Sequence, residues 1–158
     1  MVLSLYTMHA PRRNIDYSLM KLSNDMKDDK FNFLDLNKKQ FIFNNYKTQG
    51  KYNSVVIEIE NELMKVILLY LSYHPEKSKL KNKTYNIHFL KSFYTEDIIK
   101  SQEITRILNK IFGKSIGSSM IRNMYLSNKY GEMVDSLKND TKNMVTSVDV
   151  ALKTYIKE

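Results

Sequence analysis

The sequence predicts a mainly helical α+β fold with one small three-stranded antiparallel sheet, within a single domain that covers residues 1–158. Short runs of aromatic and β-branched residues are concentrated between residues 31 and 59, which indicates strands. On both sides of that segment, apolar residues recur at helical spacing. A chain of 158 residues can bury one hydrophobic core but is too short for two ordinary domains.

The composition excludes several classes of protein. A hydrophobic content of 42% argues against disorder, and the absence of cysteine excludes disulfide scaffolds and thiolate zinc sites. A net charge of +8 predicts a partner rich in phosphates or an anionic surface. No apolar run reaches the roughly 18 residues of a membrane span, and the N-terminus lacks the basic region of a signal peptide. We therefore expect a protein with no membrane partner that works inside a cell or a virion.

Two helices are expected before the sheet. The first covers the apolar residues 2–8 and ends before Pro11, because proline disfavours helical geometry in the residue that precedes it. A second helix begins at Arg12, with Pro11 in its first turn and Ile15, Leu19 and Leu22 at helical spacing.

The strands and the later helices follow in order. The three expected strands are residues 31–35, 40–44 and 54–59. The second connection, residues 45–52, forms a hairpin tip that carries Lys47 and Lys51. After the sheet we expect a helix over 60–73, a basic loop over 76–83, and a short strand or extended segment over 85–90. A helix from Thr95 to Phe112, ended by Gly113, is followed by helices over 116–130, 132–143 and 148–157, the last capped by Ser147.

Two candidate sites lie in the first third of the chain. Arg13 lies at a helix start, three residues before Asp16, so the two side chains share one helical face, next to Arg12. A solvated salt bridge is the plainer interpretation of this pattern. Lys47 on its hairpin tip is a compact donor that can reach into a ligand, whereas most lysines at such positions only keep a sheet edge soluble.

Two further candidate sites lie in the last third. Arg122 stands among Met120, Ile121 and Met124, so its guanidinium either extends to solvent or is held inward to bind an anion through two hydrogen bonds. Tyr155 belongs to the last predicted helix and is one of eleven tyrosines, so ordinary packing explains it equally well when it is considered alone.

The order of these residues resembles the catalytic domain of the tyrosine recombinases, or integrases, whose active site is shared with type IB topoisomerases. The matching positions are, in chain order, Arg13, Lys47, Ser119-x-x-Arg122, Thr146 and Tyr155. The interval of nine residues between Thr146 and Tyr155 is the most specific match. The likeness covers nearly the whole chain and is limited to the catalytic domain, so we expect the N-terminal core-binding domain of that family to be absent. It is strongest toward recombinases of large DNA viruses, virophages and related mobile elements.

The resemblance implies DNA recombination and integration without a cofactor or metal. Tyr155 would form a 3′-phosphotyrosyl intermediate, Arg13 and Arg122 would bind the phosphate, and Lys47 would protonate the leaving oxygen. Thr146 would donate a residual hydrogen bond, with Arg12, Asp16 and Ser119 in support. The implied partner is double-stranded DNA, on which the protein can self-assemble, and the lysines expected to contact it are Lys51, Lys77, Lys79, Lys81 and Lys83.

Three departures leave alternatives open. Ser119 and Thr146 occupy positions where the family has histidine or tryptophan, and Val145 replaces a glycine. Serine and threonine donate hydrogen bonds but carry no positive charge, so we expect slow cleavage. The alternatives are a degenerate DNA-binding domain that does not cleave, a type IB topoisomerase, and a basic domain that binds a protein partner.

Overall fold

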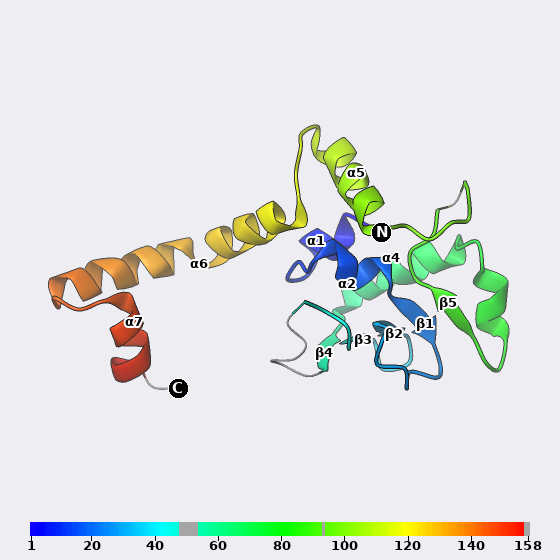
Figure 1. The fold of residues 1–158 in the computed structure, drawn as a ribbon, viewed down its shortest axis with the longest axis horizontal. Coiled ribbons are helices and arrows are strands. Elements are labelled where there is room, and N and C mark those ends of the chain that lie inside the picture. Colours follow the sequence, from blue (N-terminus) through cyan, green and yellow to red (C-terminus); the bar gives the residue numbers. More distant parts are fainter. Residues whose placement is uncertain (48–53, 93, 157–158) are drawn as a thin grey trace. The chain divides into compact units, whose positions relative to one another are not determined.

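The computed structural model describes residues 1–47, 54–92 and 94–156 (Figure 1). The chain divides into two compact units, Met1–Ile121 and Arg122–Glu158. Among the described residues, no helix combines the length and the apolar character that crossing a membrane requires.

The first unit contains a five-stranded mixed sheet, so the expectation of a three-stranded antiparallel sheet was wrong. Its strand order is β4-β3-β2-β1-β5. The strands are β1 (Lys21–Ser23), β2 (Phe33–Asp35), β3 (Gln40–Phe43), β4 (Val55–Glu58) and β5 (Asn86–His88). The antiparallel pairing of β2, β3 and β4 is confirmed, with Phe41 opposite Ile57 in its register.

The two additional strands are too short to have a recognisable period. Strand β1 runs parallel to β2, and β5 runs antiparallel to β1. Leu22 was expected in a helix because of its spacing from Leu19, but it pairs with both Leu34 and Ile87 and is fully buried. In a strand of three residues, pairing with neighbouring strands outweighs local propensity.

The helices of the first unit are α1 (Ser4–Thr7), α2 (Asn14–Ser18), α4 (Asn61–Ser72) and α5 (Ser101–Phe112), with a 3₁₀ turn, η1 (Lys77–Lys81), in the expected basic loop. Helix α5 begins at Ser101 rather than at Thr95 as expected. The chain before it turns at Glu96, whose φ is 58°, and Ile98 bridges to Lys91. Gly113 ends α5 in the left-handed conformation (φ 65°), as expected.

A cluster of aromatic rings joins α2 to the sheet. Tyr17 is fully buried, and its ring centroid lies 6.1 Å from that of Phe41 and 6.0 Å from that of Phe43, both on β3. Tyr6 of α1 packs edge-on against Tyr17 at 5.8 Å. A short helix gains its stability from such packing, so this cluster sets the position of α2 on the sheet.

The second unit consists mostly of one long helix. Helix α6 (Ser118–Asn143) starts at the end of the first unit and passes through Gly131, where a break between two helices was expected. A single glycine costs a helix only about 1 kcal/mol, which is too little to end it. A short helix, α7 (Val148–Val150), continues directly into a π-helical segment, η2 (Ala151–Tyr155), and Ser147 caps α7 as expected.

Candidate functional site

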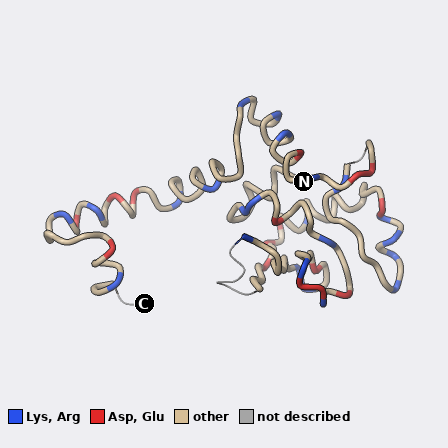
Figure 2. The backbone as a smooth tube through the Cα atoms, viewed as in Figure 1, with Lys and Arg blue, Asp and Glu red and all other residues tan. Residues whose placement is uncertain are grey.

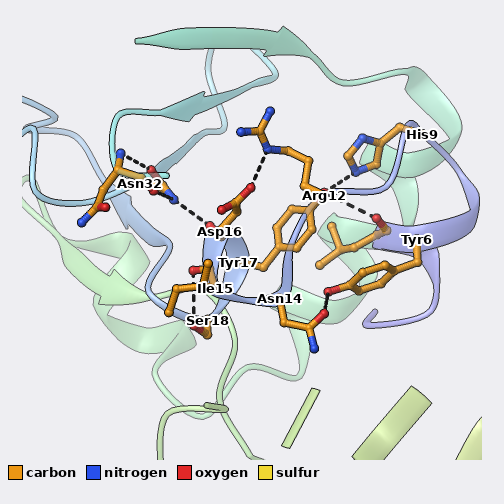
Figure 3. A network of polar contacts seen from close by, with 11 residues as sticks. Tyr6, His9, Arg12, Asn14, Ile15, Asp16, Tyr17, Ser18 and Asn32 are labelled. Atoms are coloured by element: carbon orange, nitrogen blue, oxygen red, sulfur yellow. Dashed lines mark hydrogen bonds and ion pairs between the residues drawn. The ribbon is translucent and has the colours of Figure 1, made fainter. Parts of the chain in front are cut away.

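Arg12 is held by three groups at once at the start of α2. Its Nε donates a hydrogen bond to Oδ2 of Asp16 at 3.0 Å (Figure 3). Its guanidinium carbon lies 3.8 Å from the centroid of the Phe43 ring. The same carbon lies 5.3 Å from the Tyr46 ring. An arginine over an aromatic face gains attraction from the ring quadrupole, and more when it is shielded from water. Arg12 therefore fastens the N-terminus of α2 to the chain that leaves β3.

Asp16 is only 2% exposed. Burial raises the pKa of its carboxyl above the usual value, and the charge and hydrogen bond of Arg12 partly offset that rise. Its second oxygen, Oδ1, has no hydrogen-bond partner in the part of the chain that the structure describes. The ion pair with Arg12 thus stabilises a carboxylate that would otherwise be costly to bury.

Arg13 differs from Arg12 in what its side chain contacts. It is the N-cap residue of α2 and is partly exposed. Among the described residues, no hydrogen bond or ion pair engages its side chain. Of the two neighbouring arginines, Arg13 is therefore the one available to bind an anion, and Arg12 is committed to the fold.

Residues 44–47, which follow β3, are called the stem below, and Lys47 lies at its end. It is exposed, whereas Tyr46 before it is buried against Arg12. The structure therefore brings the start of α2 together with the stem that carries Lys47. Lys51 lies outside the described residues.

Asn32 forms a second connection between the same two segments, which was not predicted from the sequence. Its Nδ2 donates to the carbonyl oxygens of Asp16 (2.8 Å) and Asn45 (3.0 Å), and its Oδ1 accepts from the backbone N–H of Asn45 at 2.8 Å. Figure 3 shows its side chain pointing toward α2. A single polar residue between Phe31 and Phe33 was the only available signal, and many strand ends share that pattern.

A buried polar network lies behind Arg12. The Tyr17 hydroxyl is hydrogen-bonded to Nε2 of His9 at 2.8 Å, and the His9 ring stacks on Phe41 with centroids 5.5 Å apart. Burial, together with the nearby charge of Arg12, lowers the pKa of His9 to about 4. His9 is therefore neutral at physiological pH and packs as an uncharged ring.

Asn14 connects α2 to two other helices. Its Oδ1 accepts from the Tyr6 hydroxyl at 2.6 Å, and its Nδ2 donates to Oγ1 of Thr105 at 2.8 Å. These bonds join α2 to α1 and α5, so two other helices support the helix start that carries Arg13.

In the second unit, α6 ends in a Schellman motif that sets the position of Thr146. The N–H of Thr146 donates to the carbonyl of Thr141 at 2.9 Å, and the N–H of Val145 donates to that of Lys142 at 3.1 Å. Val145 has a φ of 53°, in the left-handed region that favours glycine. This is the position where the resembling family has glycine.

Tyr155 lies at the end of the π-helical segment, nine residues after Thr146. Its side chain is 61% exposed, and no other described residue is hydrogen-bonded to its hydroxyl. Arg122 follows Ser119 by three residues on α6, which places both on one helical face. Within the described chain, Arg122 has no ion-pair partner either.

The basic turn after α4 is partly neutralised. Lys79 forms an ion pair with Glu76, and Lys77 donates to the carbonyl of Ser72 at 3.1 Å. Figure 2 shows several basic residues along the segment that follows α4. Lys81 and Lys83 are exposed. These two lysines are therefore the better candidates for contacts with phosphates.

No protein-family model, curated protein or solved structure matches the chain. The residues that the structure describes contain no group of three or more histidine, aspartate or glutamate side chains able to hold a metal ion. The chemistry of the protein therefore has to be inferred from its own residues.

We expect Val145→Gly to stabilise the end of α6 by about 0.5–1 kcal/mol. A left-handed conformation costs a non-glycine residue roughly 1–2 kcal/mol, and the greater freedom of glycine in the unfolded chain offsets about half of this gain. Val145 is 94% exposed, so no packing is lost. Hydrogen exchange of the Thr146 amide, which should slow in the variant, measures the effect.

Val150→Gly is the matched control for this substitution. Val150 has a φ of −66° within the helical segment, so the same change should destabilise it. Faster exchange at Thr146 in Val145→Gly would show that the left-handed residue is not strained.

We expect acid to destabilise the first unit partly through His9. Because its pKa is about 4 in the folded protein and 6.5 ordinarily, the unfolded chain binds more protons between these values. The free energy of unfolding should therefore fall as the pH drops through that window, by at most about 1.4 kcal/mol per unit of pKa difference, less for a partly exposed ring.

Denaturant titrations of the wild type and His9→Gln between about pH 7 and pH 4.5 measure this dependence. His74 and His88, whose pKa values are also lowered by burial, act in the same direction in both proteins, so the difference isolates His9. Equal slopes for the two proteins would contradict the assignment.

Proposed function

We propose that this protein cleaves and rejoins DNA strands through a covalent bond between Tyr155 and a 3′-phosphate, as the tyrosine recombinases do. The observation that carries the proposal is the corner at Val145 and Thr146. Its left-handed backbone suits the glycine that the resembling family has there, and Tyr155 follows at the family's interval of nine residues. A valine in this conformation is uncommon and has no explanation in packing, because its side chain is exposed.

The reaction is a transfer of a phosphoryl group. The oxygen of the Tyr155 hydroxyl attacks the phosphorus, a bond forms between them, and the bond from phosphorus to the 5′-oxygen breaks. The leaving oxygen takes a proton from Lys47, and the tyrosine proton passes to solvent. In the reverse step a 5′-hydroxyl attacks the phosphotyrosine and releases the enzyme, so no external energy source is needed.

The arginines neutralise charge on the phosphate. Arg13 and Arg122 present guanidinium groups that can each donate two hydrogen bonds to non-bridging oxygens. Neither has an ion-pair partner among the described residues, so neither has to give up an existing interaction to bind DNA. Donors aimed at the charge that develops in a transition state commonly provide the largest part of its stabilisation.

The residues at the two histidine positions favour a slow enzyme. Ser119 is exposed and Thr146 is half-buried, and both hydroxyls can donate to a phosphate oxygen. Neither can carry a positive charge. The same observation supports a second candidate function, a DNA-binding domain that has lost cleavage.

Replacement of the nucleophile tests the proposal directly. The wild type incubated with nicked DNA, from which the cleaved strand can diffuse away, should accumulate a covalent protein–DNA adduct. Tyr155→Phe should form none, because phenylalanine has no hydroxyl to attack phosphorus. The adduct is measured as a shifted band on a denaturing gel.

Tyr94→Phe is the control, since Tyr94 is almost fully exposed and lies outside every candidate site. It should form the adduct at the wild-type rate. DNA binding without any adduct in the wild type would instead support the non-cleaving domain, and relaxation of supercoiled plasmid without strand exchange would support a topoisomerase.

We expect Thr146→His to accelerate adduct formation. A missing donor to the charge that develops in such a transition state costs about 10²–10³ in rate, and the threonine hydroxyl already recovers part of it, so the gain should be about tenfold or more. Single-turnover rates on the nicked DNA measure it.

Thr84→His adds the same ring at an exposed threonine of the first unit and should leave the rate unchanged. A slower Thr146→His enzyme that remains folded would show that Thr146 does not occupy the position of a phosphate donor.

A further inference from the structure

Asn32 uses its whole side chain to join two segments of the backbone. It is only 2% exposed, and both of its N–H donors and its oxygen are engaged, with Asp16 on α2 and with Asn45 on the stem after β3. An asparagine is the smallest side chain with two donors and an acceptor in one plane. No other residue type of this size can make the same three bonds.

The remaining contacts of the stem do not replace this connection. The Nδ2 of Asn44 donates to the backbone carbonyl of Phe31 at 3.1 Å, and the Nδ2 of Asn45 donates to the backbone carbonyl of Lys30 at 2.9 Å. Both bonds hold the stem to the loop before β2. The hydrogen bonds of Asn32 join the stem to α2, and Arg12 also stacks on Tyr46 of the stem.

We propose that Asn32 is a positioning residue for Lys47, which it holds at a fixed place relative to the start of α2. The inference rests on the function proposed above, in which Arg13 binds the phosphate and Lys47 protonates the leaving oxygen. Lys47 lies two residues beyond Asn45, so displacement of Asn45 moves the base of the segment that carries the ammonium group. General acid catalysis requires the donor to lie within hydrogen-bond reach of the leaving atom.

The predicted defect is specific to proton donation. Asn32→Ala should slow cleavage of an ordinary phosphodiester by about 10²-fold, the cost of a misplacement of about 1 Å in a catalytic group. It should slow cleavage far less when the bridging 5′-oxygen is replaced by sulfur. A thiolate leaves without a proton, so the place of Lys47 no longer matters for that substrate.

Four variants sharpen the comparison. Lys47→Met should show the same rescue by sulfur. The double variant Asn32→Ala/Lys47→Met should be no slower than Lys47→Met alone, because both changes remove the same proton donation to the leaving oxygen. Asn32→Asp keeps the acceptor for the Asn45 N–H but loses both donors, so it should share the defect. Asn24→Ala is the control, because Asn24 joins the chain near β1 to Lys83 and Tyr85 in the same way, away from α2.

The outcomes separate the two proposals. If the wild type cleaves and Asn32→Ala slows both substrates equally, or neither, the positioning role is overturned while the proposed function stands. If the wild type forms no adduct with either substrate, the proposed function fails, and the positioning role of Asn32 in cleavage fails with it. Hydrogen exchange at the Asn45 amide still reports the connection itself in that case, and it should accelerate in Asn32→Ala but not in Asn24→Ala.

Discussion

The ion pair between Arg12 and Asp16 is the interaction on which the candidate site of the first unit depends. Asp16 is buried beside the start of a helix of only five residues, and its charge is balanced by a guanidinium that also covers Phe43. Without Arg12, the buried carboxylate would lose its partner and the helix its attachment to β3. The same Arg12 side chain also stacks on Tyr46, in the segment that leads to Lys47.

Much of the fold could be predicted from the sequence, because the decisive patterns were local. The alternation between residues 31 and 59 identified three strands, and Gly113 and Ser147 marked helix ends through their backbone and side-chain chemistry. Strand β1 could not be predicted, because its three residues continue the helical spacing of α2 and become a strand only by pairing with β2 and β5.

The candidate site was less predictable than the fold. The family resemblance favoured Arg13 as the anion-binding residue, but it gave no indication that Arg12 would be held by two aromatic rings from β3 and its stem. Asn32 was missed for the same reason, since its partners Asp16 and Asn45 are remote in sequence and are brought to it by the fold. The left-handed backbone at Val145 was not predicted either, because a valine rarely adopts that conformation.

The central claim is that Tyr155 becomes covalently attached to DNA. The most direct measurement is tandem mass spectrometry of the protein after reaction with nicked DNA, nuclease digestion and proteolysis. We expect a nucleotide joined through its 3′-phosphate to the peptide that contains Tyr155. A nucleotide attached to any other residue, or a DNA-binding protein that carries none, would contradict the claim.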